Sequence, residues 1–191
     1  MKRVLTKILL AALLTPIAES ALAMETYILD PTHTAVVWHI SHFGFSNPSG
    51  KWMASGTLVL DQAHPANSAV NVTIPLSNLV TGVPALDQHL KSKDFFNIQQ
   101  YPIATFVSNK VDVTGVDTAK VYGTLTLHGV SKPEVLDVKL NRQGMSSITH
   151  KQTVGFTATA EVNRSDFNIM MGLPGLSNKV ILDIDAEATM G

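Results

Sequence analysis

The amino-acid sequence predicts an all-β protein, a sandwich or barrel of about eight antiparallel strands with one or two short helices. Two segments alternate strictly between apolar and polar residues, 154–162 and 180–187, as strands with one buried face do. The rest of the chain consists of short stretches rich in Val, Ile, Thr and aromatic residues, separated by Gly, Pro, Asn and Asp. This pattern is typical of an antiparallel sheet and not of a βα repeat.

The other elements follow from the same pattern. Further strands are expected at 34–43, 52–60, 70–74, 103–113, 121–128 and 135–140. Residues 84–101 lack period two and carry charged and aromatic side chains, so one or two short helices are expected there, over the barrel. No internal repeat or linker interrupts the chain after residue 23, and we therefore expect one domain over residues 24–191.

The first 23 residues have the pattern of a cleaved signal peptide. Lys2, Arg3 and Lys7 precede an apolar run over residues 8–17, and Ala21-Leu22-Ala23 is a typical cleavage site. The run is shorter than the ~20 residues that a spanning helix needs, so no permanent membrane anchor is expected. The sequence thus predicts an exported protein of residues 24–191.

Composition excludes several classes of protein. The chain has no cysteine, which rules out disulfides and multi-cysteine zinc sites. Removal of residues 1–23 leaves 11 basic residues against 14 acidic ones, a net charge of about −3. Without a cluster of Lys and Arg, nucleic acid is not an expected partner.

The chain also lacks the motifs of common enzymes and metal sites. His39 and His42 would point to opposite faces of one strand, while His33 and His39 would lie about 20 Å apart, so no metal site is expected. There is no G-x-S-x-G, no H-E-x-x-H and no cysteine nucleophile. We therefore expect no catalytic residues and no cofactor.

An eight-stranded barrel either packs its interior or holds one small ligand, and two segments bear on the choice. The irregular segment 163–178 is interpreted as a flexible apolar rim with Arg164 near a polar head, or alternatively as a loop whose Arg164 pairs with a surface carboxylate. Phe95, Phe96 and Tyr101 either close a cavity mouth or anchor a helix to the core.

Five motifs in order resemble the YceI-like family of polyisoprenoid-binding periplasmic proteins. They are Tyr27-x-x-Asp30-Pro31-x-His33-Thr34, His39-x-x-His42-x-Gly44, Leu90-Lys91-Ser92-x-Asp94-Phe95-Phe96 with Tyr101-Pro102, Gly123-x-Leu125-Thr126-Leu127-His128-Gly129-Val130, and Arg164-Ser165-Asp166-Phe167. The chain departs from the family pattern at Thr34, where serine is common, and at Asn168, where glycine usually follows. The second departure puts the preferred ligand in doubt.

The resemblance implies a lipocalin-like barrel in the periplasm whose apolar channel accepts the tail of an isoprenoid quinone, a polyprenyl compound or another long-chain amphiphile. The expected function is non-enzymatic binding, storage or transport of that lipid. An enzyme with His42 or His128 as general base, and a stress-response module with a packed interior, remain alternatives, and association into a homodimer stays open. The residues expected to contact the ligand are Trp38, Ile40, His42, Phe43, Phe95, Phe106, His128, Phe156, Arg164, Phe167, Met170 and Leu173.

Overall fold

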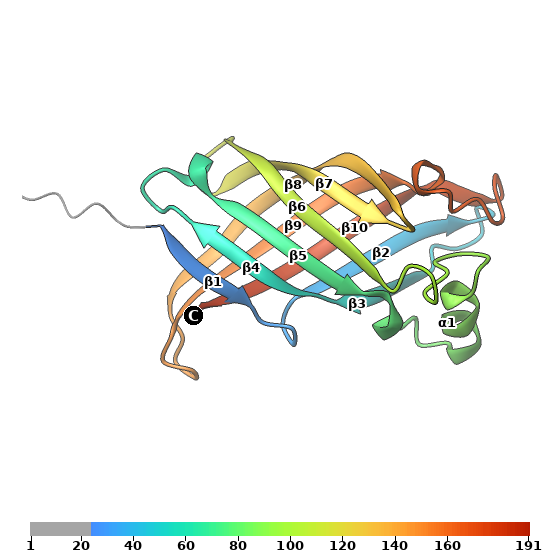
Figure 1. Cartoon of the computed structure of the whole chain (residues 1–191), viewed down its shortest axis with the longest axis horizontal. Helices are drawn as coiled ribbons and strands as arrows, with labels where there is room; N and C mark the ends of the chain where they lie inside the picture. Colours follow the sequence, from blue (N-terminus) through green and yellow to red (C-terminus); the bar gives the residue numbers. More distant parts are fainter. Residues whose placement is uncertain (1–23) are drawn as a thin grey trace, which may run out of the picture.

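A computed structural model describes residues 24–191, and the predicted signal peptide at 1–23 lies outside the described residues. Ten antiparallel strands form one sheet that closes on itself (Figure 1). In chain order they are β1 (Glu25–Leu29), β2 (Ala35–His42), β3 (Ser49–Met53), β4 (Ser55–Leu60), β5 (Ala69–Pro75), β6 (Ile103–Val113), β7 (Thr118–Leu127), β8 (Val130–Met145), β9 (Gln152–Asn163) and β10 (Leu176–Met190).

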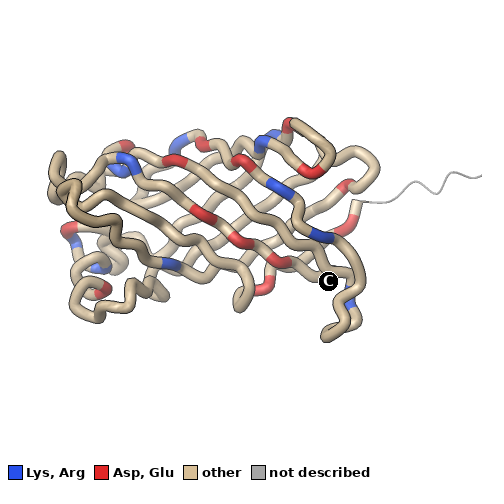
Figure 2. Tube along the Cα trace, turned by 180° about the vertical axis from the view of Figure 1, so that it is seen from behind, with Lys and Arg blue, Asp and Glu red and all other residues tan. Residues whose placement is uncertain are grey.

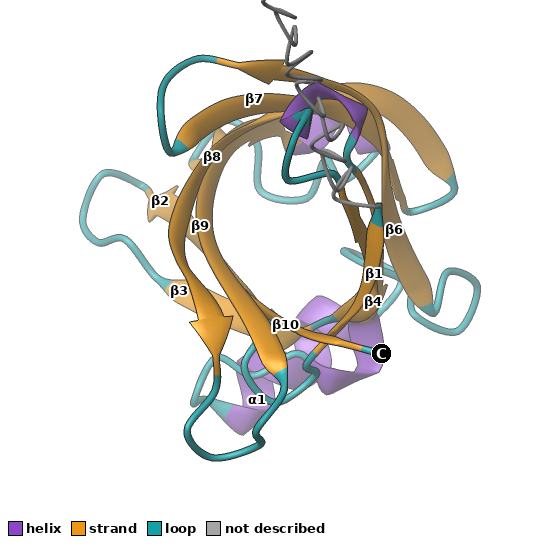
Figure 3. Cartoon of the chain, turned by 90° about the vertical axis from the view of Figure 1, so that its left-hand side faces the viewer, coloured by secondary structure: helices purple, strands orange, loops and turns teal. Residues whose placement is uncertain are grey.

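The ten strands occupy eight positions around the barrel. Strands β1 and β2 together fill one position, and β3 and β4 together fill another. Strand β10 pairs with β2 through residues 176–185 and with β1 through residues 188–190, so β1 and β2 follow one another along the same neighbour. Strands β3 and β4 pair with β2 and β1 in turn and are separated only by Ala54. A view along the axis shows the closed ring (Figure 3). The predicted eight-stranded antiparallel barrel is confirmed.

The interruption between β1 and β2 is a turn fixed by its polar side chains. The Asp30 carboxylate accepts hydrogen bonds from the backbone N–H of Thr32 at 2.8 Å and from the Thr32 hydroxyl at 2.7 Å, and it contacts His33 Nδ1 at 2.8 Å. Thr34 then reaches across to β10, where its hydroxyl donates to the carbonyl of Glu187. The Asp-Pro-x-His-Thr motif is therefore the joint that lets β2 continue the line of β1.

The sequence-based boundaries differ from the structure in three places. The segment 25–29 is a strand that the sequence pattern did not reveal, since it has only two buried residues. The expected strand 52–60 is broken at Ala54, and the expected strand 135–140 extends over 130–145.

One α-helix lies over one end of the barrel. Helix α1 (Pro84–Lys91) begins at a proline, and Asp87 in its first turn accepts hydrogen bonds from the N–H and hydroxyl of Thr81. Leu90 is its buried residue. Three short 3₁₀ helices complete the described chain: η1 (Pro65–Asn67), η2 (Leu76–Asn78) and η3 (Arg164–Phe167). Among the described residues no helix has the length and apolar character needed to cross a membrane.

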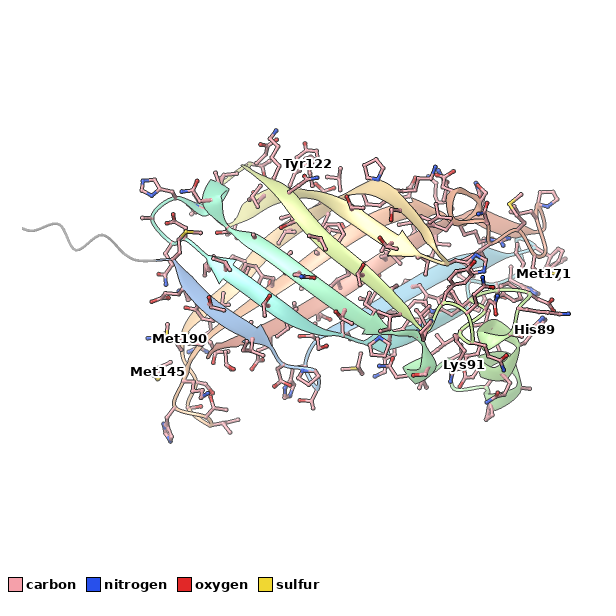
Figure 4. All side chains as sticks on the ribbon, viewed as in Figure 1. His89, Lys91, Tyr122, Met145, Met171 and Met190 are labelled. Carbon is pink, nitrogen blue, oxygen red and sulfur yellow. The ribbon has the colours of Figure 1, made fainter. Side chains whose placement is uncertain are left out.

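The packed core is divided between the two ends of the barrel. At the end that carries α1, here called the α1 end, Trp38 and Trp52 pack with Leu79 and Leu90. A second cluster around Tyr27 packs where β1 meets β10. Figure 4 shows His89 and Met171 at the α1 end and Met145 and Met190 at the opposite end. The strands between these clusters surround a cavity.

Candidate functional site

The interior of the barrel is an apolar cavity of about 420 Å³. This volume falls within the ~300–1,000 Å³ that is usual for small-molecule sites. The lining comes from the inward faces of all ten strands except β3. Its apolar members include Val36, Leu58, Val72, Phe106, Val121, Leu136, Val138, Leu140, Phe156, Ala158, Ala160, Leu182 and Ile184.

Small side chains on one wall explain why the interior is not filled. On β9 the inward residues Ala158 and Ala160 alternate with the outward Thr157 and Thr159. Ala158 lies in register with Val138 on one side and Ile184 on the other, so no aromatic ring from this row reaches the axis. The bulky aromatic residues of the α1 end lie beyond this row, and the space between remains open.

The cavity opens to solvent at the turn between β6 and β7, here called the mouth (residues 113–118). Val116 is fully exposed and also lines the cavity, so the opening lies beside it. Polar side chains also line the cavity, as expected where an apolar channel meets water. They are Gln62, Ser68, Asp117, Thr118 and Gln143.

Three polar side chains near the mouth form a hydrogen-bonded group around Glu25 of β1. The Tyr27 hydroxyl and the Gln62 amide both donate to the Glu25 carboxylate at 2.9 Å. Burial, with the hydrogen bond to Glu25, raises the pKa of Tyr27 above its ordinary value. The tyrosine is therefore a neutral hydrogen-bond donor at neutral pH.

Glu134 on β8 is the acidic residue in the apolar wall away from the mouth. It lies opposite Gly123 on β7, where a side chain would collide with the Phe106 ring, since a Cβ there would be 2.5 Å from Phe106 Cζ. Burial, followed by repulsion from Asp166, raises the pKa of Glu134. Within residues 24–191 no donor hydrogen bonds to its carboxylate.

Aromatic rings that pack tilted or edge to face fill the α1 end. Trp38 and Trp52 have ring centroids 6.3 Å apart, and Phe96 meets Trp52 edge to face at 5.1 Å. Neither indole N–H has a hydrogen-bond partner in the described part of the chain. Phe95 packs between this cluster and a third one formed by Val162, Phe167 and Ile169. The alternative in which Phe95 anchors the helical segment to the core agrees with this placement.

Arg164 is buried and holds the loop that precedes β10. Its guanidinium donates to four backbone carbonyls: Ser177 at 2.8 Å, Ile169 at 2.9 Å, Met171 at 2.8 Å and Leu176 at 3.0 Å. Burial lowers the pKa of Arg164 from its usual value. The interpretation that Arg164 pairs with a surface carboxylate is wrong, because its donors are directed to these carbonyls.

His128 occupies a two-residue turn between β7 and β8. Both His128 and Gly129 have positive φ, 51° and 75°, as a type I′ turn requires. The ring packs on Tyr101, and Nδ1 lies 3.0 Å from the carbonyl of Phe167. Since a carbonyl only accepts, Nδ1 donates this hydrogen bond, and Nε2 is buried without a partner among the described residues.

The structure brings two of the twelve expected ligand residues into the cavity lining, Phe106 and Phe156. Trp38, Ile40, Phe95 and Phe167 belong to the packed clusters of the α1 end. Ligand contact for all twelve stays a prediction. The six others lie outside the lining at the same end: His42, Phe43 and Met170 exposed, Leu173 half-buried, His128 in its turn and Arg164 within its loop.

Sequence reasoning missed most of the lining because it favoured aromatic residues and motifs. The signal was present in the alternation of 154–162 and 180–187, whose apolar faces both line the cavity. Glu134 could have been found as an acidic residue in phase with the apolar Leu136 and Val138.

One group on the outside of the barrel has ligand atoms close enough for a metal ion. Oxygen or nitrogen atoms of Asp30, His33 and Glu187 lie within 4.8 Å of one another. The Asp30 carboxylate already serves the turn described above, and His33 is exposed. Nothing further about the group indicates an ion.

A closed antiparallel barrel with an apolar interior cavity is an architecture that in other proteins holds one small ligand. The YceI-like domain family matches residues 27–188. Protein YceI of Escherichia coli O157:H7 is 39% identical over 173 residues, which cover 89% of each chain. The chain therefore belongs to the YceI-like family.

Solved structures share the fold. The YCEI protein of Campylobacter jejuni is 30% identical, with a TM-score of 0.69 over 79% of this chain and 90% of that one. A polyisoprenoid binding domain from Saccharophagus degradans, 16% identical, aligns with a TM-score of 0.66 over 88% of this chain and 100% of that one. At this low identity the second likeness concerns the fold alone.

Proposed function

We propose that this protein binds a long-chain isoprenoid, such as an isoprenoid quinone or polyprenyl compound, or a similar amphiphile, in its barrel cavity, and stores or carries it without chemical change. The observation that carries the proposal is the apolar cavity inside the barrel. Each methylene removed from water contributes about 0.8 kcal/mol, so a tail of six methylenes would gain about 5 kcal/mol before the cost of immobilising it. The polyisoprenoid binding domain from Saccharophagus degradans, which shares the fold, supports the choice of ligand.

A carrier role in the periplasm completes the proposal. The signal-like pattern of residues 1–23 supports export, and an insoluble tail needs a shielded route through water. A packed structural module is less well supported, because the interior holds a cavity. An enzyme with a histidine base is also less well supported, since neither His42 nor His128 lines that cavity.

The ligand itself is identified by native mass spectrometry of the protein purified from its own cells, followed by organic extraction. A co-purifying long-chain species in stoichiometric amount is the expected result. An apo mass that quinone, polyprenol and fatty alcohol all fail to shift would contradict the proposal.

Filling the cavity tests whether that space is where the tail binds. Ala158→Phe places a ring among the lining residues and displaces about four methylenes of tail, which should weaken binding of a fatty alcohol by about 3 kcal/mol, or a hundredfold. The matched control is Thr159→Phe, one residue further along β9 and on its exposed outer face. Equal affinity in both variants would show that the tail binds elsewhere. Ala160→Phe repeats the test if Ala158→Phe is unstable.

A further inference from the structure

The wall of the barrel is not hydrogen bonded all the way round at the α1 end. Pairing between β8 and β9 stops at Asp137 and Thr159. Beyond that point residues 130–136 of β8 pair only with β7, and residues 160–163 of β9 pair only with β10. The two strands therefore separate toward α1, with η3 directly after the end of β9. We call this place the β8–β9 gap.

Glu134 lies on the unpaired part of β8, at the edge of this gap. Its side chain is half-buried and lines the cavity among Leu125, Leu136 and Val162. Asp166 of η3 is the charged group that acts on it, and it has the same sign. Glu134 is thus a carboxylate in apolar surroundings with an acidic neighbour and, in the described chain, with no counter-ion and no hydrogen-bond donor.

A carboxylate in such a position needs a cationic or donating partner. Lys120, Lys139 and Lys179 are engaged with Asp137, Asp117 and Glu161. Besides water and the exposed Lys132, two residues before Glu134 on β8, a bound amphiphile can supply a donor at this place. An anionic head would be repelled by Glu134 and Asp166 together, whereas a protonated amine would donate to Glu134 while its tail runs along the cavity toward the mouth.

We propose that Glu134 at the β8–β9 gap is a specificity residue that favours amphiphiles with a protonated amino head over those with a carboxylate head. The inference rests on the proposed function, since it assumes that the cavity holds the tail. It adds the position of the head, which would lie at the gap and not at the mouth.

Three probes with the same twelve-carbon tail test the inference: dodecylamine, dodecanol and dodecanoic acid, titrated below their micelle concentrations into the delipidated protein at neutral pH by calorimetry. Dodecylamine is expected to bind at least about tenfold more tightly than dodecanoic acid. In Glu134→Gln the preference should fall to within about twofold, and continued binding of dodecanol would show that the cavity still accepts the tail. Glu134→Leu provides a second variant, and thermal unfolding verifies that each is folded.

The matched control is Asp117→Asn, which removes a carboxylate from the lining at the mouth. It should leave the preference intact. If the preference disappears in Asp117→Asn and survives in Glu134→Gln, the head lies at the mouth and the inference is overturned. Binding of dodecanol without any preference for the amine overturns the inference and leaves the proposed function standing, whereas failure of all three probes to bind overturns both.

Discussion

The four hydrogen bonds from Arg164 make the loop before β10 sensitive to a single polar substitution. Arg164→Met keeps the length of the side chain and removes every donor. The carbonyls of Ile169, Met171, Leu176 and Ser177 would then lose their partner. Bonds from a charged donor contribute about 1.5–3 kcal/mol each, but the removed cation no longer has to be desolvated, which offsets part of the loss.

We therefore expect a net loss of about 4 kcal/mol in the free energy of unfolding. For a chain of this size that corresponds to a fall of about 10 °C in Tm. Urea denaturation and thermal unfolding measure both quantities. The control is Arg142→Met, which changes an exposed arginine on β8 and should shift the free energy by less than about 0.5 kcal/mol.

Two results would refute this reasoning. A loss below about 1 kcal/mol in Arg164→Met would mean that the buried bonds give no net stability. A folded Arg164→Met protein with strongly reduced affinity for dodecanol, an uncharged ligand, would mean that the arginine acts on the site and not only on the loop.

Two further changes follow from the same structure. The hydrogen bond with His33, and then those from Thr32, lower the pKa of Asp30 from 3.8 to about 2, while Asp30 raises that of His33 above 6.5. Their contact should therefore stabilise the fold most between about pH 4 and pH 6.5, and the stabilisation should decline as pH falls through 2 or rises through the raised pKa of His33. Urea denaturation of Asp30→Asn and of the unchanged protein at several pH values checks this. A difference in the free energy of unfolding that stays constant with pH would contradict it. Gly123→Ala places a Cβ where the Phe106 ring lies and should lower Tm and weaken binding of dodecanol together, with an unchanged Tm contradicting the tight contact.

How far the sequence could predict the structure depends on how local each feature is. The alternation of 180–187 gave both a strand and its buried face, because period two is a property of neighbouring residues. Strand β1 was missed because the contacts that stabilise it are distant in sequence: Tyr27 and Leu29 are buried against β4 and β10. The strand pattern alone left a sandwich or a barrel open, and the resemblance to the YceI-like family implied the barrel.

The site was less predictable because a cavity is the space that side chains leave unfilled, and that space depends on the packing of the whole barrel. Trp38 and Phe106 are both buried aromatic residues on strands, yet one closes the α1 end and the other lines the cavity. The register of β6 against β7 places the Phe106 ring, because it sets Phe106 opposite Leu125 and leaves the ring lying against Gly123. The role of Arg164 likewise depends on carbonyls up to 13 residues away, whose direction no motif specifies.

Because β10 is the last strand in the chain, its position also determines at what stage of synthesis the barrel can close around its cavity. Figure 2 shows acidic positions in a row along the outer side of the wall leading to the C terminus, which agrees with Asp183, Asp185 and Glu187 alternating with inward residues on β10. Tyr27 of β1 meets Met190 of β10, so the first and last strands close the ring together. Contacts of such long sequence separation form slowly and late in folding. A nascent chain therefore has no enclosed cavity until β10 has been synthesised, and the proposed ligand would enter only after that step.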